Sequence, residues 1–115
     1  AHNAASAAGV STSMWWIDAE SDNTWNDDAI QNRDSLQGER DALTDRGAGT
    51  VGVYSTTSEW QTITGDWQNG WPSWIGAHDA SSGQGRQACT GHQFTGGPTL
   101  VVQTDEHDID RDIAC

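Results

Sequence analysis

Asp18 and Glu20 are the residues whose types and spacing most directly suggest chemistry. They follow the apolar run 14–17, which predicts a buried strand that opens into a polar end. Side chains two positions apart on a strand project from the same face, about 6.5 Å apart along it. Two carboxyl groups this close, beside Trp16, should separate in pKa, so that one stays protonated and the other ionised. A glycosidase needs such a pair; the alternative is that the two acids only cap a helix or face solvent.

Tyr54, Trp74 and Gln103 are the candidates for binding a sugar. Aromatic faces stack on pyranose rings, and an amide both donates hydrogen bonds to hydroxyl groups and accepts them. Each of the three lies in a predicted strand or at its end. Since the chain is poor in Leu and Ile, most other tryptophans are expected in the core or as groove walls: Trp15, Trp25, Trp60, Trp67 and Trp71.

Strand and helix patterns alternate along the chain. The strands are predicted at 14–17, 50–54, 72–76, 99–103 and 109–113, and the helices at 27–46, 56–63 and 81–88, with a further short helix before Gly9. Gly38 should interrupt or weaken the first long helix. This alternation predicts an α/β fold, with a parallel sheet of about five strands joined by right-handed crossover helices. The carboxyl ends of such strands are where these folds place active sites.

The charge of the chain limits its partners. In 115 residues there are 17 acidic and five basic side chains, which gives a net charge of -12. Such a charge repels nucleic acid and anionic membranes, so neither is expected as a partner. No apolar run approaches the roughly 20 residues needed to cross a bilayer. The length corresponds to one domain, residues 1–115.

Cys89 and Cys115 are the two cysteines of the chain. An even number of cysteines in an acidic chain without Lys fits one disulfide in an oxidising, extracellular compartment; the alternative is two unrelated buried thiols. The four histidines show no zinc spacing, and the acidic stretch 105–112 lacks the Gly and Glu that an EF-hand loop requires. We therefore expect no metal and no other cofactor.

Five motifs occur in an order that resembles the glycoside hydrolase family 25 lysozymes, most closely a secreted branch of the actinobacterial type. The first is the D-x-E strand, residues 15–20. The others are 52–55 followed by Trp60, the strand 72–77, the strand 99–103 that ends in an active-site Gln, and the closing Asp110-Arg111-Asp112. The resemblance extends over nearly the whole chain.

The resemblance implies a secreted, cofactor-free hydrolase that cuts the β-1,4 bond after N-acetylmuramic acid in peptidoglycan. Glu20 would be the proton donor, Asp18 its electrostatic partner, and Asp112 the substrate-binding Asp of the closing strand. That branch also implies a disulfide between Cys89 and Cys115. The family's fold is a TIM-like (β/α)8 barrel, which typically takes about 250 residues.

Because the D-x-E of that barrel lies on a middle strand, the chain should be its carboxyl-terminal half, a fragment with little activity alone. The first strand would then expose an unpaired edge, which predicts self-association through that edge. Two rival hypotheses are a carbohydrate-binding domain on the same scaffold that has lost turnover, and a structural surface protein from a salt-rich habitat.

Overall fold

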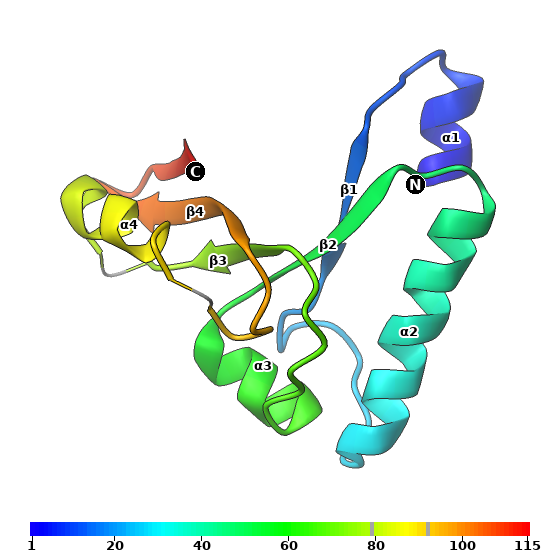
Figure 1. Ribbon diagram of the computed structural model, residues 1–115, viewed down its shortest axis with the longest axis horizontal. Helices are drawn as coiled ribbons and strands as arrows, with labels where there is room; N and C mark the ends of the chain where they lie inside the picture. The colour runs from blue at the N-terminus through cyan, green and yellow to red at the C-terminus, as the bar shows by residue number, and fades with distance from the viewer. Residues whose placement is uncertain (79, 92) are drawn as a thin grey trace.

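A five-stranded sheet with the order β1-β2-β3-β4-β5 forms the centre of the computed structural model, which describes residues 1–78, 80–91 and 93–115 (Figure 1). The elements follow one another as α1 (His2–Ala7), β1 (Met14–Asp18), α2 (Ala29–Asp45), β2 (Thr50–Ser55), α3 (Thr57–Thr64), β3 (Ser73–Gly76), α4 (Ser82–Ala88), β4 (Thr99–Asp105) and β5 (Asp110–Ala114). The predicted α/β fold and its five strands are thereby confirmed.

β5 departs from the predicted topology. Strands β1 to β4 pair in parallel, but β5 pairs with β4 in the antiparallel direction, with Gln103 opposite Asp112. Only residues 106–109 separate β4 from β5. A connection between two parallel neighbouring strands needs a dozen residues or more. A connection as short as this one can therefore only form an antiparallel hairpin. Within the described residues the sheet is open, with β1 and β5 at its two ends.

One face of the sheet is covered by helices and holds the core. Alternate strand residues such as Ile17, Val53 and Val102 are fully buried there, together with Leu36 of α2 and Trp60 of α3. Figure 1 shows α2 alongside β1 and β2, and α4 beside β4. The expected role of the tryptophans is confirmed, because this core includes Trp60 and Trp71 and is packed against by Trp15, Trp25 and Trp67.

α2 continues without a break through Gly38, so the predicted interruption is wrong. A glycine inside a helix costs about 1 kcal/mol relative to Ala. Tertiary contacts on the opposite side of the helix offset that cost: Leu36 is 1% exposed, and buried Asn32 donates to the carbonyl oxygen of Ile63 at 2.9 Å. Neither α2 nor any other helix in the described ranges is long and apolar enough to cross a membrane.

A disulfide between Cys89 and Cys115 joins the end of α4 to the end of the chain, which confirms the predicted pairing. α4 also packs tightly on the sheet, because a Cβ at Gly85 would come within 2.7 Å of Thr104 and 3.0 Å of Ile113. The disulfide and this contact together hold β5 against β4. The pairing of Asp110 with Asp105 then places the first residues of β5 at the edge of the sheet where β1 to β4 end.

Candidate active site

The segment Asp18–Glu20 is fixed in place by its own backbone. The N–H of Ala19 donates to the carbonyl oxygen of Tyr54 at 2.9 Å, and the hydroxyl of Ser55 donates to the carbonyl oxygen of Ala19 at 2.7 Å. The last carbonyl of the segment accepts a 2.7 Å hydrogen bond from Nε1 of Trp25. Ala19 is fully buried by these contacts. The side chains of Asp18 and Glu20 therefore extend from a backbone segment that is held firmly at the end of β1.

The Glu20 carboxyl group has a pKa above its ordinary value. Partial burial is the main cause; the negative charge of Asp18 and a hydrogen bond shared between the two carboxyl groups raise the pKa further, with smaller contributions from Glu59 and Asp22. A carboxyl group that keeps its proton closer to neutral pH is suited to act as a general acid. The predicted pair thus lies together, and the pKa of Glu20 is shifted in the direction that a general acid requires.

Glu59 of α3 anchors the residue that follows Glu20. Its Oε1 accepts hydrogen bonds from the backbone N–H of Ser21 at 3.0 Å and from the Ser21 hydroxyl at 2.7 Å, and Oε2 accepts one from Thr56 at 2.9 Å. Burial alone would raise the pKa of Glu59, but these hydrogen bonds outweigh burial and lower it. The pKa values of two neighbouring glutamates are therefore shifted in opposite directions, lowered for Glu59 and raised for Glu20.

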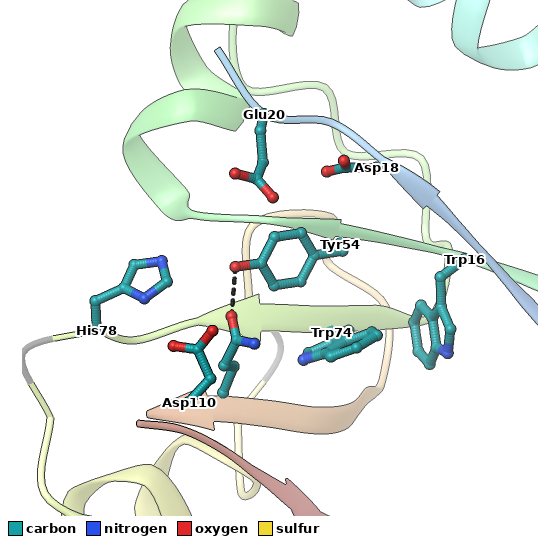
Figure 2. A pocket seen from close by; sticks show the side chains of 8 residues that line it. Trp16, Asp18, Glu20, Tyr54, Trp74, His78 and Asp110 are labelled. Carbon is teal, nitrogen blue, oxygen red and sulfur yellow. Dashed lines mark hydrogen bonds between the residues drawn. The ribbon is translucent and has the colours of Figure 1, made fainter. Parts of the chain in front are cut away.

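Asp18 and Glu20 face a cavity of about 430 Å³ at the carboxyl edge of the sheet (Figure 2). That volume is within the range of small-ligand sites. Figure 2 shows the two carboxyl groups on one side of the cavity, with Asp110 and His78 on the other and Tyr54 between them. The residues that line it are Trp16, Asp18, Glu20, Tyr54, Trp74, His78, Gln103 and Asp110. Five of the six predicted catalytic and substrate-binding residues are therefore brought together.

Asp112 is the predicted residue that the structure leaves out of the cavity lining; Asp110 takes its place. The reason is the direction of β5. In an antiparallel strand, the first residue and not the last lies at the edge where the parallel strands end, and here Asp110 pairs with Asp105 beyond Gln103. The short connection 106–109 was the signal in the sequence that could have identified Asp110.

Trp16, Tyr54 and Trp74 form the apolar part of the cavity wall. The Trp74 ring meets the other two edge to face, with centroid distances of 5.7 Å to Trp16 and 5.1 Å to Tyr54. Trp16 lies over Gly52, its partner in register on β2, where a Cβ would come within 2.5 Å of the indole ring. Only glycine at position 52 leaves room for this tryptophan.

Tyr54 and Gln103 are joined across the cavity wall. The Tyr54 hydroxyl donates to Oε1 of Gln103 at 2.6 Å, and this is the hydrogen bond drawn in Figure 2. Burial, followed by the charges of Glu20, Glu59, Asp110 and Asp18, raises the pKa of Tyr54 to about 12. The hydroxyl therefore keeps its proton throughout the physiological pH range and remains a hydrogen-bond donor.

His78 is a cavity residue that sequence reasoning missed. It follows the end of β3 by two positions, the same placement that identified Glu20 after β1. Among the described residues, no group of three or more His, Cys, Asp or Glu side chains is placed to hold a metal ion; His92, one of the four histidines, lies outside those residues. The cavity offers carboxyl groups, an amide, an imidazole and aromatic faces.

Comparison with protein families gives one result that bears on this site. Residues 1–95 match the family described as Lysozyme-like protein 1. The matched range includes Asp18, Glu20, Tyr54 and Trp74 and ends before Gln103. No curated protein and no solved structure matches the chain. Because the match spans most of the sequence, the chain belongs to the Lysozyme-like protein 1 family.

Proposed function

We propose that this chain carries the catalytic carboxyl groups of a secreted cell-wall glycosidase of the glycoside hydrolase family 25 type. The observation that carries the proposal is the raised pKa of Glu20 beside Asp18, at a cavity of a size suited to a small ligand, in a chain of a lysozyme-like family. The substrate would be the β-1,4-linked glycan of peptidoglycan, cut after N-acetylmuramic acid. The disulfide supports an oxidising, extracellular location.

Glu20 would act as the general acid. Its proton moves to the glycosidic oxygen as the bond from that oxygen to C1 of the sugar breaks, and positive charge develops on the ring. Water finally supplies the hydroxyl group on C1 and returns a proton to Glu20. The negative charge of Asp18 stabilises that charge. The negative charge of Asp18 raises the pKa of Glu20, so the two carboxyl groups lie near enough to act on each other. This proximity supports an electrostatic role for Asp18.

Tyr54, Trp74 and Gln103 would hold the sugar against this pair. The two aromatic rings offer apolar surface for the pyranose, and the Gln103 amide offers hydrogen bonds to its polar substituents. Asp110 would bind from the opposite wall, the place that the resemblance assigns to Asp112. The four parallel strands and their crossover helices are compatible with part of the (β/α)8 barrel of that family.

Analysis of the ends created in digested cell wall tests this proposal. Purified peptidoglycan is incubated with the native polypeptide that carries residues 1–115, the new reducing ends are reduced with borohydride, and the sugars are identified by mass. We expect reduced muramic acid. Reduced glucosamine would overturn the assignment of the bond. Binding to the glycan without any new reducing end would establish the rival function, a carbohydrate-binding domain.

A further inference from the structure

A second cavity, of about 350 Å³, lies beside the segment that joins β1 to α2. Figure 1 shows this segment passing between α2 and α3. The cavity is lined by residues of the segment, among them Asn23, Trp25, Asn26 and Asp27, and by residues of α2 and α3. It shares no lining residue with the candidate active site. The two cavities are therefore separate places on the molecule.

Hydrogen bonds hold the joining segment at both of its ends. Near its start, Nε1 of Trp25 donates to the carbonyl oxygen of Glu20 at 2.7 Å. Near its end, the buried side chain of Asn32 accepts from the N–H of Asn26 at 2.8 Å and donates to the carbonyl oxygen of Asn26 at 2.8 Å. A wall that is already ordered loses less conformational entropy when a ligand binds. The cavity is thus organised in advance for a ligand.

The same network determines which exposed polar atoms along the segment remain available. Nδ2 of Asn23 donates to the carbonyl oxygen of Asp18 at 3.1 Å, so Oδ1 of Asn23 is left as an acceptor. Oδ1 of Asn26 accepts from the N–H of Asp28 at 2.9 Å, so Nδ2 of Asn26 is left as a donor. The exposed carboxylate of Asp27 has no hydrogen bond or ion pair within the described residues. The segment therefore offers two acceptors and one donor.

We propose that this cavity is a second carbohydrate site, which holds a neutral sugar ring and takes no part in cleavage. Hydroxyl groups both donate and accept, so neighbouring hydroxyls of one ring can pair with the Asn26 donor and with the acceptors of Asn23 and Asp27. Trp25 is partly exposed and supplies apolar surface for the ring. This inference goes beyond the proposed function, because it does not depend on which bond is cut or on which residue donates the proton.

Other classes of ligand match the available atoms less well. A cation would leave the Asn26 donor facing a positive charge. An anion would meet the carboxylate of Asp27 in a chain whose net charge is -12. An extended peptide typically adds to the exposed edge of a sheet, whereas this cavity lies among two helices and a connecting segment. A neutral polyol is the class that uses both acceptors and the donor.

The test is an NMR titration of the native polypeptide in its ¹⁵N-labelled Glu20→Gln form. The probe is the neutral β-1,4-linked trimer of N-acetylglucosamine. We expect the side-chain amide signal of Asn26 and the indole N–H signal of Trp25 to shift and to reach saturation. Asp27→Ala should weaken this response about tenfold, because hydrogen bonds to a charged group are lost. The indole signal of Trp74, which reports on the candidate active site, should behave as in the parent form.

Asn26→Asp is the second variant, because it keeps the acceptor for the N–H of Asp28 and replaces the donor by an oxygen. It should also weaken the response of Trp25. Two controls make the same changes of charge at exposed positions of α2 outside the cavity: Asp34→Ala and Gln31→Glu. Both controls should bind the trimer as tightly as the parent form.

Three results would overturn the inference. The first is the absence of a saturating shift at Asn26 and Trp25 in the parent form. The second is an equal loss of affinity in Asp27→Ala and Asp34→Ala. The third is a response to the fully deacetylated, cationic trimer but not to the neutral one, which would make the cavity a cation site. The signal of Trp74 does not enter this judgement, so failure of the second site and failure of the proposed function are distinguishable.

Discussion

Ser21 donates two hydrogen bonds to Oε1 of Glu59, from its backbone N–H at 3.0 Å and from its hydroxyl at 2.7 Å. α3 thereby holds the loop that begins directly after Glu20. Because these hydrogen bonds favour the ionised form, the pKa of Glu59 is lower in the folded protein than its ordinary value of 4.5. Its contribution to stability is present above pH 4.5 and is lost as the pH falls through the lower, folded value.

Glu59→Gln should therefore lower the Tm at neutral pH. We expect a fall of about 4 °C at pH 7, since one or more hydrogen bonds to a charged group are weakened. Below the folded pKa of Glu59, the carboxyl group is protonated in the wild type as well, and the two proteins should melt at similar temperatures. Thermal unfolding followed by circular dichroism at a series of pH values measures this. An equal difference at every pH would contradict the assigned role of the charge.

Glu20→Gln should show the opposite dependence. The pKa of Glu20 is raised in the folded state, so its ionisation destabilises the fold as the pH rises above 4.5. Glutamine cannot ionise and avoids this cost. The Tm of the variant relative to wild type should therefore increase from acid to neutral pH. A relative Tm that falls over this range would show that Glu20 is stabilised in its charged form.

Gly52→Ala should destabilise the protein by about 1–3 kcal/mol, because the new methyl group would overlap the Trp16 ring and the backbone of Pro72. Gly38→Ala is the matched control: nothing lies within 4 Å of a Cβ there, and alanine in the middle of α2 should stabilise by about 0.5–1 kcal/mol. Urea unfolding of both variants measures the difference. Equal stability of the two would mean that Trp16 does not occupy the space above residue 52.

Replacing both Cys89 and Cys115 by serine should lower the free energy of unfolding by about 3 kcal/mol, since the disulfide closes a loop across a sequence separation of 26 residues. The loss should also loosen β5 and with it Asp110. We therefore expect weaker glycan binding in addition to a lower urea midpoint. Adding a reductant should lower the stability of the wild type and leave the double variant unchanged. A wild type that is insensitive to reductant would contradict a stabilising disulfide.

Much of the sheet could be predicted because local signals and tertiary packing agree. Each apolar, β-branched run became a strand, and residues at the ends of three of them, Asp18, Tyr54 and Gln103, came to the cavity. The carboxyl ends of parallel strands meet at one edge, so residues distant in sequence are brought together without any knowledge of side-chain contacts.

The predictions were wrong, or missed a residue, where the structure depends on the length of a connection or on contacts between residues distant in sequence. The direction of β5 depends on the length of residues 106–109, and it exchanges Asp112 for Asp110 in the cavity. The continuity of α2 through Gly38 depends on contacts that Leu36 and Asn32 make with other elements. Glu59 accepts hydrogen bonds from Ser21, which lies 38 positions away in the sequence, and no local sequence pattern predicts this contact.

Glycan cleavage by Glu20→Gln tests the catalytic assignment most directly. Release of reducing ends from peptidoglycan is measured for the native polypeptide, for this variant and for Glu39→Gln, which makes the same change on α2 outside the cavity. We expect a rate at least about 100-fold lower for Glu20→Gln, with binding of the glycan retained, because a general acid typically contributes 10²–10⁴-fold. Glu39→Gln should cleave at the wild-type rate. Undiminished cleavage by Glu20→Gln would show that the proton comes from another group.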